Sequence, residues 1–228
     1  MKNLVVLTGA GISAESGLKT FRDTDGLWEG YDVYEVASPL GWKANPALVL
    51  EFYNLRRKDV QAAQPNRAHL ALAELEKDFN VTVVTQNIDD LHERAGSTQV
   101  VHLHGEIFKM RGENSYSPVY PITGDIKLGD LAPDGSQYRP HIVWFGEAVP
   151  EIERAARIME TADVFILAGT SLQVYPAAGL MEYLPRAVPK YIVDKKIPPV
   201  ERYVNVIPIE KPATEGMEIV KKLLNPGS

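Results

Sequence analysis

The chain has 228 residues, of which 45% are hydrophobic and 24% are charged, and this length predicts one large domain or one domain with a small second module. Its 24 Lys and Arg residues against 30 Asp and Glu residues give a net charge of −6, which argues against a nucleic-acid-binding surface. Cysteine is absent, so disulfides, thiolate zinc sites, iron–sulfur clusters and a thiol nucleophile are excluded. No apolar run approaches the roughly 18 residues of a membrane span, and the first run is too short for a signal peptide. We therefore expect a soluble, cytoplasmic protein without nucleic-acid or membrane partners.

Short apolar runs and amphipathic patterns alternate along the chain. In order, we expect a strand at 4–7, helices at 48–55 and 68–77, strands at 81–84 and 100–103, a helix at 151–161, strands at 164–168, 191–193 and 204–207, and a helix at 215–224. The strands lack polar alternation, which indicates a parallel sheet covered on both faces. The alternation of strands and helices predicts a doubly wound α/β fold. Two polar segments without a period, 19–38 and 111–139, interrupt it and are typical of a lid or a small inserted module.

A glycine-rich turn follows the first strand, with Gly9 and Gly11 in a G-x-G-x-x-A pattern and Ser13 near a helix start. Glycine lets the backbone approach a pyrophosphate, and the free N–H groups of a helix start face an anion. Such turns also serve packing alone. The acidic residue that a dinucleotide-binding dehydrogenase carries about 20 positions later is missing. Arg22 could contact a phosphate or lie on the surface, and composition favours neither.

Polar side chains also end the strand at 81–84. Gln86, Asn87 and Asp89 offer amide and carboxylate groups that can bind a carboxamide or a ribose hydroxyl at the carboxyl end of a sheet. The alternative is helix capping by Asn87 or Asp89, which this motif taken alone favours.

Two histidines end the strand at 100–103, and strand alternation puts His102 and His104 on one face. His104 is a candidate general base near pH 7, although a lone histidine is more often a satisfied polar residue. Metal binding is disfavoured because the remaining histidines show no ligand spacing.

A second glycine turn, Gly169–Ser171, follows the strand at 164–168 and opens a helix, an arrangement suited to ribose or phosphate. Two glycine turns and two polar clusters at the ends of different strands favour a dinucleotide site over simple packing, which no single turn does.

The motifs together resemble those of the sirtuins, the NAD-dependent protein lysine deacylases. The resemblance rests on six segments in family order: Gly9–Ser13, Thr20–Arg22, Gln86–Asp89, His104–Glu106, His141–Glu147 and Gly169–Ser171. It implies a Rossmann-like domain over residues 1–29, 66–106 and 141–228, and a small discontinuous domain over residues 30–65 and 107–140.

The resemblance also implies the reaction and its partners. NAD is the cofactor, and acyl-lysine proteins or peptides are the substrates. The acyl oxygen attacks C1′ of the nicotinamide ribose, nicotinamide leaves, and the acyl group ends on ADP-ribose. His104 is the general base on a ribose hydroxyl, and Asn87 is the second catalytic residue.

The implied NAD contacts come from the glycine turns, the polar strand ends and the loop after the first turn. They are Gly9, Ala10, Ser13, Glu15, Thr20, Phe21, Arg22, Trp28, Gln86, Asn87, Ile88, Asp89, Gly169, Thr170, Ser171, Val193, Asp194, Lys195 and Ala213. The implied peptide contacts are Val143, Trp144, Phe145 and Gly146, which would form an edge strand that the substrate extends, with Phe145 against the lysine stem.

Tyr53 and Arg56 lie at i and i+3 on the expected helix, beside the stripe of Leu48, Phe52 and Leu55. They are either a flanking tyrosine and a solvated arginine, or acyl-binding residues, because the pair resembles the sirtuin subgroup that removes succinyl and malonyl groups. A guanidinium can bind an acyl carboxylate through two hydrogen bonds while a phenol donates a third. We therefore hypothesise a preference for acidic acyl groups, with possible deacetylase activity.

The interval from 107 to 140 departs from the family, which usually holds a structural zinc there through four cysteines. We expect a metal-free module held by the packing of tyrosine, proline and leucine side chains. Two other functions stay open at this stage: mono-ADP-ribosyl transfer from the same NAD site, and a non-catalytic protein that binds NAD or acyl-lysine.

Overall fold

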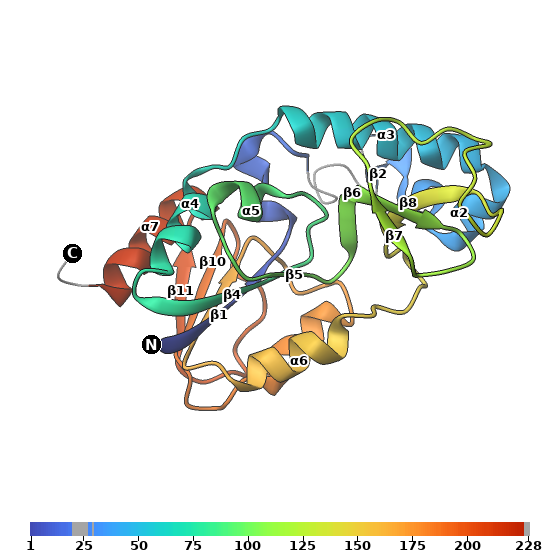
Figure 1. Cartoon of the computed structure of the whole chain (residues 1–228). Coiled ribbons are helices and arrows are strands. Elements are labelled where there is room, and N and C mark those ends of the chain that lie inside the picture. The colour runs from blue at the N-terminus through green and yellow to red at the C-terminus, as the bar shows by residue number, and fades with distance from the viewer. Residues whose placement is uncertain (20–26, 29, 226–228) are drawn as a thin grey trace.

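The computed structural model describes residues 1–19, 27–28 and 30–225. A larger lobe surrounds a six-stranded sheet, and a smaller lobe combines a three-stranded sheet with a long helix (Figure 1). Among the described residues, no helix combines the length and hydropathy needed to cross a membrane.

The six-stranded sheet is parallel throughout, with strand order β11-β10-β9-β1-β4-β5. Its strands are β1 (Lys2–Thr8), β4 (Phe79–Thr85), β5 (Val100–His102), β9 (Val164–Ala168), β10 (Lys190–Asp194) and β11 (Val206–Glu210). Each expected strand has its counterpart here, which confirms the doubly wound α/β fold. β11 begins two residues later than expected, because Val204 lies on the surface before the strand starts.

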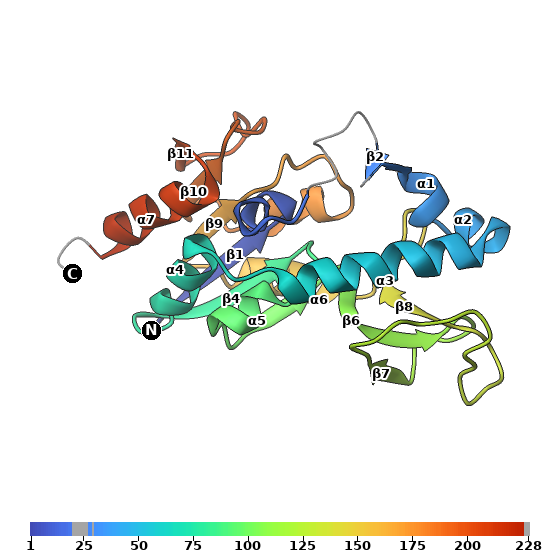
Figure 2. The same ribbon diagram turned by 90° about the horizontal axis from the view of Figure 1, so that it is seen from above.

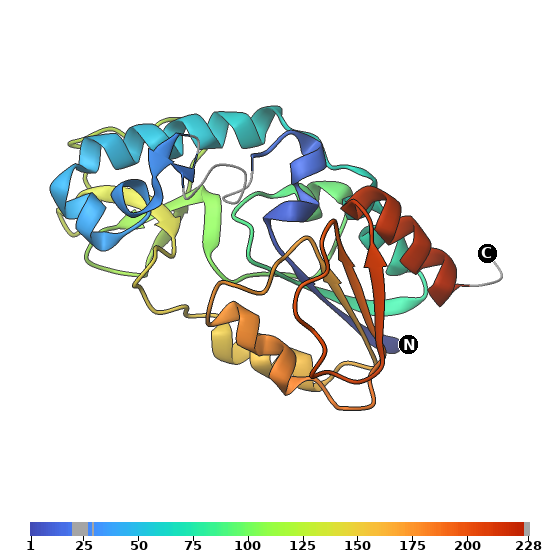
Figure 3. The same ribbon diagram turned by 180° about the vertical axis from the view of Figure 1, so that it is seen from behind.

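Helices cover both faces of this sheet, and alternate side chains of β1 show how. Leu4 and Val6 pack against α4 (Arg67–Leu75) and α7 (Ala213–Leu224). Val5 and Leu7 pack on the opposite face, where they meet α6 and the 3₁₀ helix η3. Figures 1 and 3 show the two helical layers from the front and from behind. Of the helices just named, α6 spans Ile152–Glu160 and η3 spans Ala177–Tyr183. This lobe also contains α5 (Leu91–Ala95) and the short 3₁₀ helices η1 (Ala10–Ile12) and η2 (Ala14–Ser16).

The strand order reverses direction between β1 and β9. The chain passes from β1 to β4 and β5 on one side, and then returns to β9 on the other side of β1. In an open α/β sheet, ligands bind at the carboxyl ends of the strands beside such a reversal. The turns that follow β1 and β9 therefore border the expected site.

The smaller lobe comes from two separate parts of the chain. Its elements are β2 (Leu27–Trp28), β3 (Tyr31–Asp32), α1 (Val33–Val36), α2 (Pro39–Ala44), α3 (Pro46–Ala62), β6 (Gly105–Gly112), β7 (Val119–Pro121) and β8 (Tyr138–Ile142). The sheet β7-β6-β8 is antiparallel. Its core joins Trp42, Val49, Phe52, Ile107 and Trp144.

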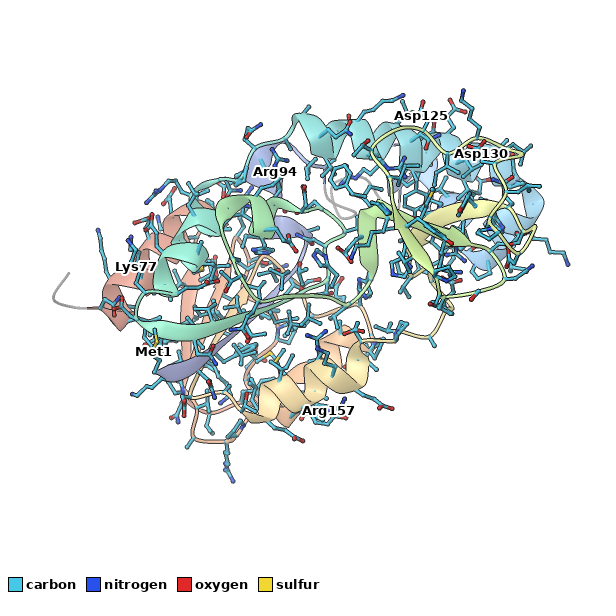
Figure 4. All side chains as sticks on the ribbon, viewed as in Figure 1. Met1, Lys77, Arg94, Asp125, Asp130 and Arg157 are labelled. Atoms are coloured by element: carbon cyan, nitrogen blue, oxygen red, sulfur yellow. The ribbon has the colours of Figure 1, made fainter. Side chains whose placement is uncertain are left out.

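Helix α3 runs along the smaller lobe and ends against the larger one (Figure 2). Arg94 of α5 donates hydrogen bonds to the carbonyls of Val60, at 3.1 Å, and Ala63, at 2.6 Å (Figure 4). The predicted apolar stripe of α3 is partly wrong, because Leu55 is 47% exposed. The buried face of α3 instead includes Val49, Tyr53, Arg56 and Val60.

Arginine side chains, rather than leucines, dominate the interior of the module at 107–140. Leu128 and Leu131 are exposed, so the predicted leucine packing is wrong, whereas Tyr120 and Tyr138 do meet edge to face. Buried Arg57 donates to the carbonyls of Ile107 and Gly124 and ties the module to α3. In the part of the chain that the structure describes, no group of three or more His, Asp or Glu side chains could hold a metal ion.

Candidate active site

The two glycine turns pack directly on each other at the reversal point of the sheet. The Gly9 N–H donates to the Ala168 carbonyl at 3.1 Å, and the Gly11 N–H donates to the Gly169 carbonyl at 2.9 Å. A Cβ on Gly11 would lie 2.8 Å from the Gly169 Cα, and Gly169 itself has a left-handed φ of +67°. Only glycine permits this approach, so the turns form a single backbone-lined edge.

Three buried polar residues form a network beside this edge. The Ser13 Oγ donates to Asp89 Oδ2 at 3.0 Å, and the Asn87 side-chain amide donates to the Ser13 Oγ at 3.1 Å. Burial raises the pKa of Asp89 above its ordinary value. The Asp89 Oδ1 also accepts from the Leu91 N–H at the start of α5, although the N-cap residue of this helix is Asp90 and not Asp89. The Asn87 side-chain amide contacts Ser13 instead of capping the helix.

Gln86 joins the ends of two strands. Its side-chain amide donates to the Thr170 Oγ1 at 3.1 Å. This hydrogen bond connects the end of β4 with the turn that follows β9. The Gln86 N–H donates to the Thr8 carbonyl at 2.9 Å, which fixes the backbone of the same residue. Gln86 therefore lies between the first glycine turn and the second.

His104 lies at the same edge, with its Nδ1 3.0 Å from the Gln86 carbonyl. A carbonyl oxygen can only accept a hydrogen bond, so Nδ1 carries the proton and Nε2 keeps its lone pair. Burial lowers the pKa of His104 below its ordinary value, because the charged form loses hydration, although the Gln86 carbonyl opposes this shift. The ring is thus neutral at pH 7 and can accept a proton at Nε2.

His102 contacts the next backbone carbonyl, that of Asn87, but its pKa shifts in the opposite direction from that of His104. Its Nδ1 lies 3.0 Å from the Asn87 carbonyl, and its Nε2 lies 2.7 Å from Glu93 Oε1. Burial disfavours its charged form, but the hydrogen bond and charge of Glu93 outweigh burial and raise the pKa of His102. His102 is therefore held as a structural ion pair.

A pair of buried histidines, His69 and His92, lies next to the Ser13 network. The sequence indicates no role for them and only disfavours metal binding by them. The His69 and His92 rings meet edge to face, with centroids 4.9 Å apart. His92 Nε2 lies 3.0 Å from the Thr8 Oγ1 at the end of β1. Burial lowers the pKa of His69 to about 4, so this ring is neutral. A capping box, in which the Asn66 N–H donates to His69 Nδ1 at 3.2 Å, holds the His69 ring at the start of α4.

Tyr53 and Arg56 reach the site from α3. Tyr53 is fully buried, and its hydroxyl accepts a hydrogen bond from the Trp144 indole N–H at 3.1 Å. The Arg56 Nη2 donates to the Lys19 carbonyl at 2.9 Å. The Arg56 charge favours the ionised form of both Asp89 and Tyr53, although burial raises the pKa of each. The guanidinium therefore lies near both the Ser13 network and the phenol, so the surface-arginine alternative is wrong for Arg56.

Comparisons with known proteins match this arrangement. The Sir2 family model matches residues 9–176, more than half of the chain. The chain belongs to the Sir2 family, the sirtuins. An NAD-dependent protein deacylase from Bacteroides thetaiotaomicron is 56% identical over 99% of both chains, and one from Helicobacter pylori is 53% identical over 100% of both.

Solved sirtuin structures agree over nearly the whole chain. A Sir2 homolog–NAD complex has a TM-score of 0.88 and 39% identity, and covers 99% of this chain and 90% of that one. A Sir2 protein bound to acetylated peptide has a TM-score of 0.82 and 30% identity, and covers 99% of this chain and 94% of that one.

The remaining residues predicted to bind NAD lie, where the structure describes them, at or just after the ends of β1, β4, β9 and β10 and at the start of α7. Val193 and Asp194 end β10, and Ala213 begins α7. Glu15 accepts hydrogen bonds from the backbone N–H and the hydroxyl of Thr214, so its carboxylate also satisfies the first turn of α7. The others are placed as follows: Ala10 in η1, Ile88 half-buried between Asn87 and Asp89, Ser171 after β9 and Lys195 after β10.

Part of the predicted cofactor loop cannot be placed. Thr20, Phe21 and Arg22 lie outside the described residues. Trp28 belongs to β2, where its backbone pairs with Tyr31, but its side chain is also outside what the structure describes.

The structure does not form the edge strand that was predicted at 143–146. β8 ends at Ile142, and Phe145 lies in a turn that the Glu147 N–H closes onto the Trp144 carbonyl at 3.0 Å. The Val143 N–H donates to the His104 carbonyl at 2.9 Å. The segment therefore begins beside His104 and continues as a loop that contains this turn.

Proposed function

We propose that this sirtuin is an NAD-dependent protein lysine deacylase that prefers succinyl and malonyl groups over acetyl. The observation that carries the catalytic part is the neutral His104 ring, oriented by the Gln86 carbonyl and placed on the edge where the two glycine turns meet. The curated relatives named NAD-dependent protein deacylase support the activity, and the solved complexes with NAD and acetylated peptide support the ligands.

The residues at this edge fit NAD in chemistry and in shape. The turns at Gly9 and Gly169 present backbone instead of side chains, which suits a pyrophosphate and its sugars. Asn87 and Asp89 offer the amide and carboxyl groups that a carboxamide pairs with, and Gln86 lies where it can bind the adjoining ribose. Bound NAD supplies the ADP-ribosyl group that accepts the acyl group, with nicotinamide as the leaving group.

The chain's own contribution to the reaction is orientation and proton transfer. The Ser13–Asn87–Asp89 network holds its polar groups in fixed directions, which favours one pose of the leaving group. His104 Nε2 then takes a proton from a substrate hydroxyl, because its Nδ1 proton is committed to the Gln86 carbonyl. The other described residues predicted to bind NAD would then contact its adenosine and pyrophosphate.

The acyl preference rests on Arg56 and Tyr53. The Arg56 guanidinium is buried near Asp89 and Tyr53, and a succinyl or malonyl carboxylate can accept charge-assisted hydrogen bonds from it. Tyr53 lies one turn away on the same face of α3 and can add a phenol donor.

Turnover of succinyl-lysine and acetyl-lysine peptides by wild type, Arg56→Met and Arg56→Lys tests this preference. We expect succinyl to be preferred by the wild type, and Arg56→Met to lose roughly 10- to 100-fold in kcat/KM for succinyl, the scale of a charge-assisted hydrogen bond. Arg56→Lys keeps the charge but not the paired geometry and should lose less. A strong acetyl preference that Arg56→Met leaves unaffected would contradict the proposal.

We also propose the domain division stated above, with residues 1–29, 66–106 and 141–228 forming the NAD-binding unit. The six strands of the parallel sheet all lie within it. β6 and β8 of the small sheet each cross a proposed boundary by two residues, at Gly105 and at Ile142. β2 falls inside the 1–29 part of this unit, although it pairs with β3 of the smaller lobe.

A further inference from the structure

Trp144 makes the contact with Tyr53 from a fixed position in the core. The indole N–H donates to the Tyr53 hydroxyl at 3.1 Å, and the two side chains are 2% and 0% exposed. Their rings are tilted with centroids 6.5 Å apart. Because burial raises the pKa of Tyr53 well above its ordinary value, the phenol keeps its own proton at working pH. Its oxygen accepts from the indole, so the direction of its O–H bond is constrained.

Two charged side chains fix Trp144 in turn. The Trp144 backbone N–H donates to Glu147 Oε2 at 2.8 Å, and the Arg139 guanidinium carbon lies 3.2 Å from the indole centroid. Arg139 also donates to both Glu147 carboxylate oxygens, at 2.7 and 3.1 Å. The indole is thus clamped between a backbone hydrogen bond and a stacked cation.

The charges of Arg139, Arg111 and Glu147 affect how strongly the Trp144 indole N–H donates a hydrogen bond. Arg111 adds a second guanidinium 3.9 Å from Glu147, so two cations share one carboxylate in the interior of the small lobe. A cation over an aromatic face is attracted by its electrons and draws density away from the ring, which favours donation by the indole N–H. The cluster therefore strengthens the bond that orients Tyr53.

We propose that Trp144, Arg139 and Glu147 are positioning residues for acyl selectivity, and that they act by orienting the Tyr53 hydroxyl toward the carboxylate of an acidic acyl group. This inference rests on the proposed function, because it concerns the acyl end of the same site. Through these contacts, residues of the small lobe that do not touch the substrate would influence which acyl group is accepted.

The test compares the succinyl-to-acetyl ratio of kcat/KM in wild type and Trp144→Phe. Phenylalanine keeps an aromatic ring beneath Arg139 but cannot donate to Tyr53. We expect the ratio to fall about fivefold, the size of one neutral hydrogen bond. Trp42→Phe is the matched control: Trp42 is also buried, its ring lies 5.6 Å from that of Trp144, and its indole N–H donates to Glu113 instead. This control should keep the wild-type ratio.

A double-mutant cycle with Tyr53→Phe separates positioning from a general structural role. If Trp144 acts through the phenol, Trp144→Phe changes the ratio by less than about twofold when Tyr53 is already phenylalanine. An equal fall in both backgrounds, or an equal loss of succinyl and acetyl turnover, would overturn the inference. So would a Trp42→Phe ratio as low as that of Trp144→Phe.

A second variant covers the case in which Trp144→Phe does not fold. Glu147→Gln keeps an oxygen for the Trp144 N–H but removes the charge that pairs with Arg139, and we expect the same fall in ratio with Tyr53 present and none with Tyr53→Phe. A Glu147→Gln ratio equal to that of the wild type, or an equal fall in the Tyr53 and Tyr53→Phe backgrounds, would contradict positioning. A wild-type ratio at or below one overturns the acidic-acyl proposal together with this inference, whereas a wild-type preference that neither variant changes overturns positioning alone.

Discussion

His102 and His104 contact consecutive backbone carbonyls, those of Asn87 and Gln86, each through its Nδ1 at 3.0 Å. They differ in what their other nitrogen meets. His102 Nε2 pairs with Glu93, which raises its pKa against the effect of burial, whereas burial lowers the pKa of His104. One strand end thus presents two histidines whose pKa values shift in opposite directions, and we propose the neutral one, His104, as the general base.

This contrast predicts different outcomes for substitutions at positions 102 and 104, which are separated by Leu103. His104→Ala should reduce nicotinamide release about 10²- to 10⁴-fold, the usual contribution of a general base. His102→Gln keeps a donor for the Asn87 carbonyl and should cost stability more than turnover. Steady-state release assays and thermal melts of both variants check this. A large loss in His102→Gln with a fully active His104→Ala would reverse the assignment.

The lowered pKa of His104 predicts the pH dependence of turnover. A base must be unprotonated to act, so kcat/KM falls as pH decreases through the pKa of this ring. Because burial places that pKa below the ordinary value of about 6.5, activity should persist below pH 6.5 before it declines. A pH profile of kcat/KM measures the midpoint, and an acid limb centred above 6.5 would contradict the account.

The packed glycine turns predict a strong effect of one added methyl group. In Gly169→Ala the new Cβ would lie 2.2 Å from the Ile12 backbone nitrogen, in addition to the strain of a left-handed φ. We expect about 3 kcal/mol of lost stability or more, together with lost NAD binding. Gly17→Ala is the matched control, because its φ is also left-handed but nothing lies within 4 Å. It should cost about 1–2 kcal/mol in chemical denaturation. Equal costs would argue against the contact.

We propose that the module at 107–140 folds without a metal, which predicts that chelators do not affect folding. Buried Arg57, Arg111 and Arg139 make the contacts that hold residues 107–140, and the chain has no cysteine to bind zinc. The melting temperature should be the same with and without EDTA, and elemental analysis should find no stoichiometric zinc. Stoichiometric zinc, or a fall in melting temperature on chelation, would show that another donor set holds a metal.

The large sheet and its glycine turns could be predicted because continuous apolar runs determine both the buried strands and their parallel pairing. The polar cluster at Ser13, Gln86 and His104 followed from the convergence of strand ends at one edge. Its internal connections did not, because the contact of Asn87 with Ser13 joins residues 74 positions apart. Local pattern carries no information on such pairs.

The small lobe was less predictable for a related reason. Its interior depends on long arginine side chains that cross between segments, as Arg57 and Arg139 do, and composition marks these as surface residues. Leu55 and the turn after Ile142 were mispredicted because tertiary contacts, not local periodicity, decide which side chains are covered there.

Mass spectrometry of the products formed from NAD and a succinyl-lysine peptide tests the central claim most directly. The account predicts free lysine peptide, nicotinamide and O-succinyl-ADP-ribose in equal amounts with wild type, and none of them above background with His104→Ala. Peptide or protein that carries ADP-ribose while its acyl group stays in place would instead indicate mono-ADP-ribosyl transfer. NAD binding without any turnover would indicate a protein that only binds its ligands, and either result would contradict the account.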